Sequence, residues 1–139
     1  MPNSLVSFAL WACSIALAGA YVPHKKTAAA YENAKAAGAE SRTNPLVSDA
    51  KAVAEGARLY EARCEVCHGG EGKGDGVAAV AMTPPPADLT SAERWAYSSV
   101  GVKQWIVVNG VAKTSMAPTG LTEDESWQVL AFIQQSFQP

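Results

Sequence analysis

Cys64, Cys67 and His68 are the residues whose types and spacing could do chemistry in this chain. Two cysteines flank two residues and a histidine follows directly, in the order Cys64-Glu65-Val66-Cys67-His68. This pattern is typical of covalent c-type haem attachment, in which the sulfurs bond to the porphyrin vinyl groups and the histidine binds the iron. Residues three and four apart share a helix face, so one turn can present all three groups. We therefore predict one haem c on Cys64 and Cys67, with His68 as an axial ligand of the iron.

Two other chemistries use a Cys-x-x-Cys pair. A structural zinc site would need two further ligands, and outside the motif the chain offers only Cys13 and His24, both near the N-terminus. A thiol redox couple belongs in an alternating βαβ context, and no such pattern is present. Haem attachment therefore remains the favoured interpretation.

Three apolar helical stretches would have to position the motif. The first has Ser48 as its N-cap and continues up to the motif. The second covers residues 95–108 and ends at Asn109-Gly110. The third opens with a capping box formed by Thr122 and Glu125. No alternating strand pattern is present, so the predicted fold class is all-α.

The charge of the chain limits its partners. Residues 48–139 carry seven basic and eleven acidic residues, a net charge of −4 before any haem charge. The chain has no run of lysine or arginine, and an acidic domain binds nucleic acid poorly. We therefore exclude nucleic acid as a partner and expect steering towards basic docking surfaces.

The N-terminus contains an apolar segment without a charged residue, residues 5–22. As a helix it would be ~27 Å long, close to the ~30 Å hydrocarbon layer. We expect residues 1–22 to be a retained membrane anchor; the alternative is a secretory signal cleaved after a small-x-small site such as residues 18–20. A third alternative makes Cys13 a lipidated residue. By the positive-inside rule, Lys25 and Lys26 would place the C-terminal end of this segment in the cytoplasm. A haem domain of this kind is nevertheless expected in the periplasm or on the outer side of the cytoplasmic membrane.

Residues 23–47 are rich in alanine and polar residues and have poor apolar periodicity. We expect a flexible linker here, with a weak helix over residues 27–37 that ends at Gly38. The predicted organisation is then an anchor or signal at 1–22, a linker at 23–47 and a haem domain at 48–139.

The chain resembles class I cytochrome c from about Ser48 to Phe137. The matching residues are Gly56 and Tyr60 on the first helix, Val129 and Phe132 on the last helix, the glycine-rich run 69–76 and the proline run 84–89. In that family a proline carbonyl accepts a hydrogen bond from the second nitrogen of the histidine. The resemblance assigns this role to one of three prolines, with Pro86 preferred over Pro84 and Pro85.

The resemblance also implies a methionine as the second axial ligand. Met116 lies between the second and third expected helices, where the family has its ligand, although Ala117 separates it from Pro118. Met82 precedes the proline run, and Met1 is remote in sequence. We predict Met116, because a thioether suits haem iron and raises its potential relative to a second histidine.

These expectations describe a monohaem electron carrier that performs no bond-making chemistry itself. It would exchange single electrons with redox protein partners of a respiratory or photosynthetic chain, as a tethered shuttle or as a subunit of a complex. The alternative is a haem enzyme or gas sensor with an open sixth coordination site.

Overall fold

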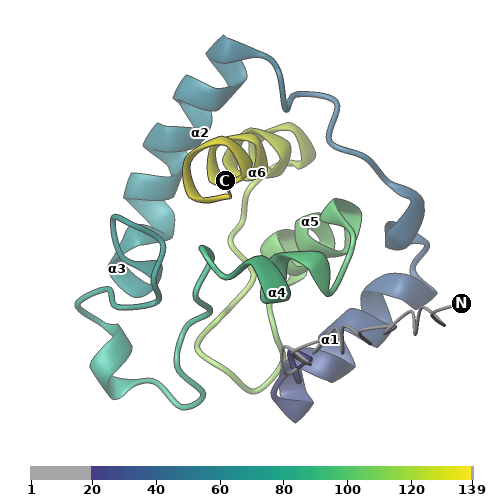
Figure 1. Ribbon diagram of the computed structural model, residues 1–139, viewed down its shortest axis with the longest axis vertical. Helices are drawn as coiled ribbons and strands as arrows, with labels where there is room; N and C mark the ends of the chain where they lie inside the picture. Colours follow the sequence, from purple (N-terminus) through teal and green to yellow (C-terminus); the bar gives the residue numbers. More distant parts are fainter. Residues whose placement is uncertain (1–19, 139) are drawn as a thin grey trace, which may run out of the picture.

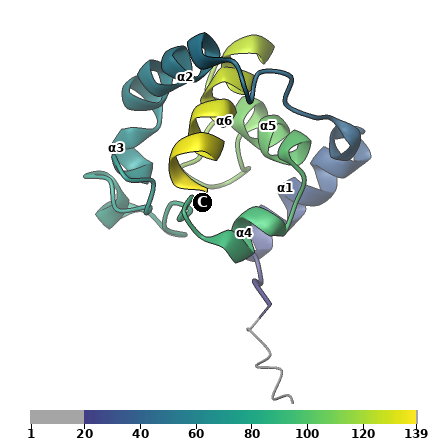
Figure 2. The ribbon, with the colours of Figure 1, turned by 45° about the horizontal axis from the view of Figure 1, so that its top comes forward.

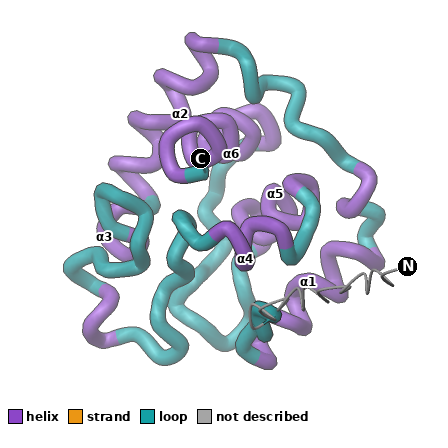
Figure 3. The backbone as a smooth tube through the Cα atoms, viewed as in Figure 1, coloured by secondary structure: helices purple, strands orange, loops and turns teal. Residues whose placement is uncertain are grey.

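The computed structural model describes residues 20–138, and within them every regular element is helical (Figures 1 and 3). In chain order the elements are α1 (Lys25–Ala36), η1 (Ala39–Ser41), α2 (Ala50–Arg63), α3 (Glu65–His68), η2 (Ala79–Ala81), α4 (Ala92–Ala96), α5 (Val100–Asn109) and α6 (Glu123–Phe137). The all-α prediction is therefore confirmed.

The core of the fold is the crossing of α2 and α6 (Figure 1). Gly56 on α2 permits this approach, since a Cβ there would overlap the backbone carbonyl of Gln128 on α6. Tyr60 and Val129 lie in the core at the crossing, 2% and 0% exposed. The ring of Tyr60 also contacts those of Phe132 and Phe137, with centroids 5.3 Å away in each case.

Caps fix where the helices begin. The capping box at the start of α6 is present, with the Thr122 hydroxyl accepting from the Glu125 N–H and the Glu125 carboxylate accepting from the Thr122 N–H. The cap of α2 is Asp49 rather than the expected Ser48, because the helix begins at Ala50 and the Asp49 carboxylate accepts two N–H groups of its first turn.

The second expected helix is divided in two. The chain turns after α4 and restarts at α5, where the Ser99 hydroxyl caps the new helix by accepting from the Val102 N–H. The predicted end at Asn109-Gly110 is confirmed.

The segment 23–47 corrects the expectation of a flexible linker. Helix α1 packs against α5, and α5 lies between α1 and α6 (Figure 2). Tyr31 and Ala34 of α1 are 6% and 0% exposed, in a second apolar cluster with Val102. The buried face consists largely of alanine, so its apolar periodicity is weak although its fit to α5 is close.

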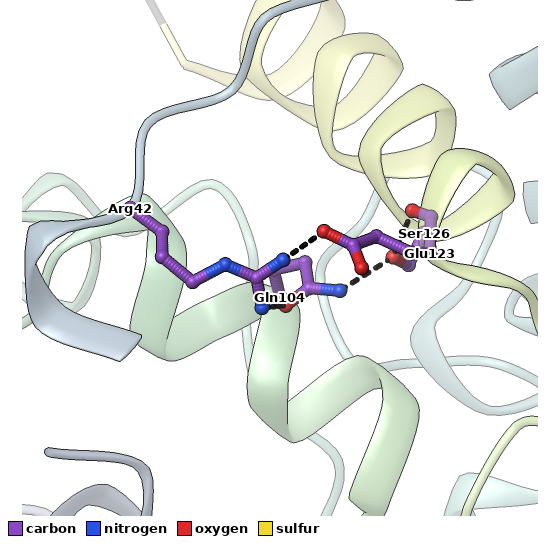
Figure 4. A network of polar contacts seen from close by, with 4 residues as sticks. All are labelled: Arg42, Gln104, Glu123 and Ser126. Carbon is purple, nitrogen blue, oxygen red and sulfur yellow. Dashed lines mark hydrogen bonds and ion pairs between the residues drawn. The ribbon is translucent and has the colours of Figure 1, made fainter. Parts of the chain in front are cut away.

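A polar network fastens the same segment to the core (Figure 4). Arg42 donates to the Gln104 side chain at 2.8 Å and also pairs with Glu123. Gln104 donates in turn to the Ser126 hydroxyl at 2.9 Å. The network therefore ties the end of the N-terminal segment to both α5 and α6.

Most of the predicted membrane segment, with Met1 and Cys13, lies outside the described residues. None of the helices between residues 20 and 138 combines the length and the apolar character that a membrane-spanning helix requires.

Candidate functional site

The two cysteines and the histidine lie in one helical turn, as predicted. Cys64 ends α2, and its carbonyl accepts the Cys67 N–H at 3.1 Å and the His68 N–H at 2.8 Å. Both cysteines are free thiols and half-buried. One turn thus presents two thiols and an imidazole, from positions 64, 67 and 68.

The environment of Cys64 does not suit thiol redox chemistry. Burial raises the pKa of the Cys64 thiol to about 11, and the neighbouring Cys67 adds to the effect. A catalytic thiol pair works through a thiolate whose pKa is lowered. Among residues 20–138, no group of three or more His, Cys, Asp and Glu side chains is arranged to hold a metal ion.

His68 is oriented by a backbone carbonyl from the proline run. Its Nδ1 atom lies 3.0 Å from the carbonyl oxygen of Ala87, to which the Nδ1–H donates. This bond fixes the tautomer and leaves Nε2 free to bind a metal. Burial lowers the pKa of His68, which favours the neutral imidazole that a metal requires.

The acceptor is therefore Ala87, and the preference for Pro86 was wrong. The Pro86 carbonyl instead lies against Gly74, where a Cβ would come within 2.7 Å of its oxygen. The Leu89 N–H donates to the Gly72 carbonyl at 2.6 Å, which ties the proline run to the glycine-rich run. The Gly74 N–H donates to the backbone carbonyl of His68 at 2.8 Å, which ties the glycine-rich run to the motif. The sequence pattern indicated the loop, but which carbonyl faces the ring depends on how the two loops pack.

The glycine-rich run returns over the motif. The buried Tyr60 hydroxyl donates to the Gly69 carbonyl at 2.7 Å, which links α2 to the start of the run. Further along the run, the Gly76 N–H donates to the backbone carbonyl of Cys67 at 3.1 Å, and the Ala78 N–H donates to the backbone carbonyl of Val66 at 2.9 Å. Residues 69–78 thus cover the outer side of the motif.

The loop that carries Met116 is fastened to the same region. The Met116 carbonyl accepts from the Val111 N–H at 2.7 Å, and its N–H donates to the Thr114 hydroxyl at 3.1 Å. Arg63, the residue before Cys64, donates to the Thr119 carbonyl at 3.0 Å. The Arg63 contact, which the sequence did not indicate, brings this loop to the end of α2.

Both candidate methionines are half-buried. Met82 follows η2 at the start of the proline run, and Met116 lies in the loop between α5 and α6. The assignment of Met116 as axial ligand stays a prediction.

The residues present fit a covalently held haem. Two free thiols, an imidazole with a free Nε2 and a thioether on a separate loop form a suitable donor set. Half-buried apolar side chains around the core supply the surface that a flat apolar group needs; they include Leu59, Leu89, Trp95, Val100, Val107, Phe132 and Phe137.

Comparison with known proteins agrees with this reading of the site. A family model described as cytochrome c matches residues 53–137, which include the motif, both loops and α6. No curated protein matches the chain.

Proposed function

The chain belongs to the cytochrome c family, and from this premise we propose a monohaem electron carrier tethered to the outer side of the cytoplasmic membrane. The family implies a covalently bound haem c and a role in electron transfer. The proposal adds one haem, partners in a respiratory or photosynthetic chain, and an anchor at residues 5–22.

When bound, haem c supplies a one-electron Fe(III)/Fe(II) couple. The observation that carries the proposal is the hydrogen bond from His68 Nδ1 to Ala87, in the turn that presents Cys64 and Cys67. The two thiols would hold the porphyrin, and Nε2 of His68 would bind the iron. The Ala87 carbonyl holds the Nδ1 proton and raises the basicity of the ring.

Met116 would supply a second protein ligand to the iron through its thioether sulfur. Because six ligands would leave no position for a substrate, the protein itself would carry out no bond-making step. The contact between Arg63 and Thr119 supports this role, since it joins the Met116 loop to the cysteine-bearing end of α2.

The test is a spectrum of the reduced, purified protein at neutral pH, with and without carbon monoxide. We expect a haem that survives acid–acetone extraction and a spectrum that carbon monoxide does not change promptly. A prompt change would instead indicate an open site, as in a haem enzyme or gas sensor. Loss of the haem on extraction would indicate a thiol or zinc module.

The membrane tether is tested separately by the intact mass of the protein extracted from membranes. The mass of the full chain plus one haem would support a retained anchor. A mass that lacks the first 20 or so residues would show a cleaved signal, and an added acyl mass would show lipidation of Cys13.

A further inference from the structure

Three exposed valines lie close to the haem-attachment turn. Val66, Val77 and Val80 are 50%, 85% and 95% exposed. Large apolar side chains that remain this exposed in one short stretch are a common mark of an interaction surface. We call these three residues the valine patch.

The segments that carry the valine patch lie side by side. The Ala78 N–H donates to the Val66 carbonyl at 2.9 Å, so the segment that carries Val77 lies beside α3. Val66 and Val77 line the same surface hollow. Val80 lies on η2, which contacts α3.

Carboxylates surround the valine patch. Glu61, Glu65 and Asp75 line the same hollow as Val66 and Val77. The ion pairs found within residues 20–138 involve none of these three carboxylates. Their charge is therefore available to a partner, and we call them the acidic rim.

The patch is close to the place where the haem would be attached. Val66 lies between Cys64 and Cys67 in sequence, and the Cys67 carbonyl accepts the Gly76 N–H at 3.1 Å. The patch therefore includes one residue of the attachment turn itself, and the segment before Val77 is hydrogen-bonded to Cys67.

We propose that the valine patch with its acidic rim is the docking face for a redox protein with an apolar centre ringed by lysine and arginine. This inference rests on the proposed function as an electron carrier. Opposite charges would steer the encounter, and the valines would exclude water at the contact. One electron leaves the reduced cytochrome and reduces the partner by one electron.

The first test is the rate of oxidation of the haem-loaded, reduced full chain by two small oxidants. Tris(1,10-phenanthroline)cobalt(III) is a cation with apolar aromatic ligands, and it is reduced to the cobalt(II) complex. Hexacyanoferrate(III) is an anion, and it is reduced to hexacyanoferrate(II). We expect the triple variant Glu61→Gln/Glu65→Gln/Asp75→Asn to react about tenfold more slowly with the cation at low ionic strength, and faster with the anion. The control Glu32→Gln/Glu40→Gln/Asp124→Asn changes the net charge equally at exposed positions elsewhere, and should alter either rate less than twofold.

The valines are tested in the same assay. Val77→Ser/Val80→Ser should slow the reaction with the apolar cation and leave that with hexacyanoferrate(III) unchanged. Val22→Ser is the matched control, because Val22 is 83% exposed and lies outside the patch. Equal effects of the patch and control variants would show that electrons leave by another face. That outcome would overturn the docking face while leaving electron transfer itself intact.

Poly-L-lysine serves as a macromolecular probe of the acidic rim. It should bind the wild type at low ionic strength and slow its oxidation by the cobalt complex, and the rim variant should lose both effects. Sedimentation of the wild type tests a second copy of the chain as the occupant. A dimer that Val77→Ser/Val80→Ser converts to a monomer would overturn the proposal.

Discussion

Gly56 of α2 lies directly against the backbone carbonyl of Gln128 on α6, with no room for a Cβ between them. The two helices therefore meet backbone to backbone at the centre of the fold. The same crossing buries Tyr60, whose hydroxyl holds the start of the glycine-rich run. A change at Gly56 would thus affect both the core and the site.

We predict that Gly56→Ala destabilises the protein, because its Cβ would force α2 and α6 apart. The substitution gains about 1 kcal/mol of helix propensity, whereas over-packing costs about 1–3 kcal/mol or more. Because the added Cβ would overlap the Gln128 carbonyl oxygen, the cost falls at the upper end of this range. We expect a net loss of about 2 kcal/mol, measured as the free energy of unfolding in denaturant. Ala54→Ser on the exposed side of α2 is the control. An unchanged or raised stability in Gly56→Ala would show that the two backbones are not in contact.

The family resemblance pointed to the residues of the α2–α6 crossing, and the sequence predicted a weak helix at residues 27–37, close to the observed α1. What the sequence did not predict is that this helix packs against α5. Gly56, Tyr60 and the capping box at Thr122 are local signals whose partners lie in regular helices. Helix α1 buries mostly alanine. An alanine-rich sequence is found both in flexible linkers and in closely packed helix interfaces, so its composition does not distinguish the two. Similarly, the proline run indicated a carbonyl for His68, but the packing of two loops decides between Pro86 and Ala87.

The packing of α1 gives the second prediction. Tyr31 is 6% exposed, and its ring lies 5.0 Å from that of Tyr97. Tyr31→Ala should release α1 from α5 and lower the hydrogen-exchange protection of residues 25–36 by at least roughly 100-fold, since truncating a buried aromatic costs about 3–5 kcal/mol. Protection in α2 and α6 should stay unchanged. Exposed Glu32→Ala is the control, and equal protection in both variants would mean that α1 does not depend on this contact.

Gly74 gives the third prediction, which concerns the orientation of His68. Its φ is +77°, and an added Cβ would lie 2.7 Å from the Pro86 carbonyl. Gly74→Ala should displace the proline run and weaken the hydrogen bond from His68 to Ala87. A less basic imidazole stabilises Fe(III) less, so we expect the midpoint potential of the loaded protein to rise.

Gly38→Ala is the matched control for that change. Gly38 has a φ of +75° and no atom within 4 Å of an added Cβ, so it carries the same backbone strain without the clash. A midpoint potential that shifts equally in both variants would mean that the Gly74 contact does not orient His68.

The fourth prediction separates the two candidate methionines. The loop of Met116 is held to the end of α2 by the contact between Arg63 and Thr119, at 3.0 Å. Met116→Ala should abolish the weak far-red charge-transfer band of methionine-bound ferric haem, and Met82→Ala should leave the band unchanged. The reverse pattern would assign the ligand to Met82.

The last prediction concerns Lys103, a cation among backbone acceptors. Its Nζ donates to the Trp95 carbonyl at 2.7 Å, to the Ser98 hydroxyl at 3.2 Å and to the Ser98 carbonyl. The same atom lies 4.6 Å from the centroid of the Trp95 ring. Burial lowers the pKa of Lys103 from 10.5 to about 8. The acceptors offset part of the cost of the buried ammonium group.

The sign of the pH dependence follows from this shift. Between pH 8 and 10.5 the folded chain has released the Lys103 proton while the unfolded chain still binds it. The free energy of unfolding rises with pH wherever the unfolded state binds more protons. Below pH 8 the buried charge therefore lowers the stability by its full cost, and above pH 8 this cost decreases as the folded chain loses the proton. Relative to Lys103→Met, the wild type should gain about 1–2 kcal/mol of unfolding free energy across this window, after allowance for partial solvent screening. Exposed Lys51→Met should show no such divergence, and parallel curves for the wild type and Lys103→Met would mean that the folded-state pKa of Lys103 is not lowered.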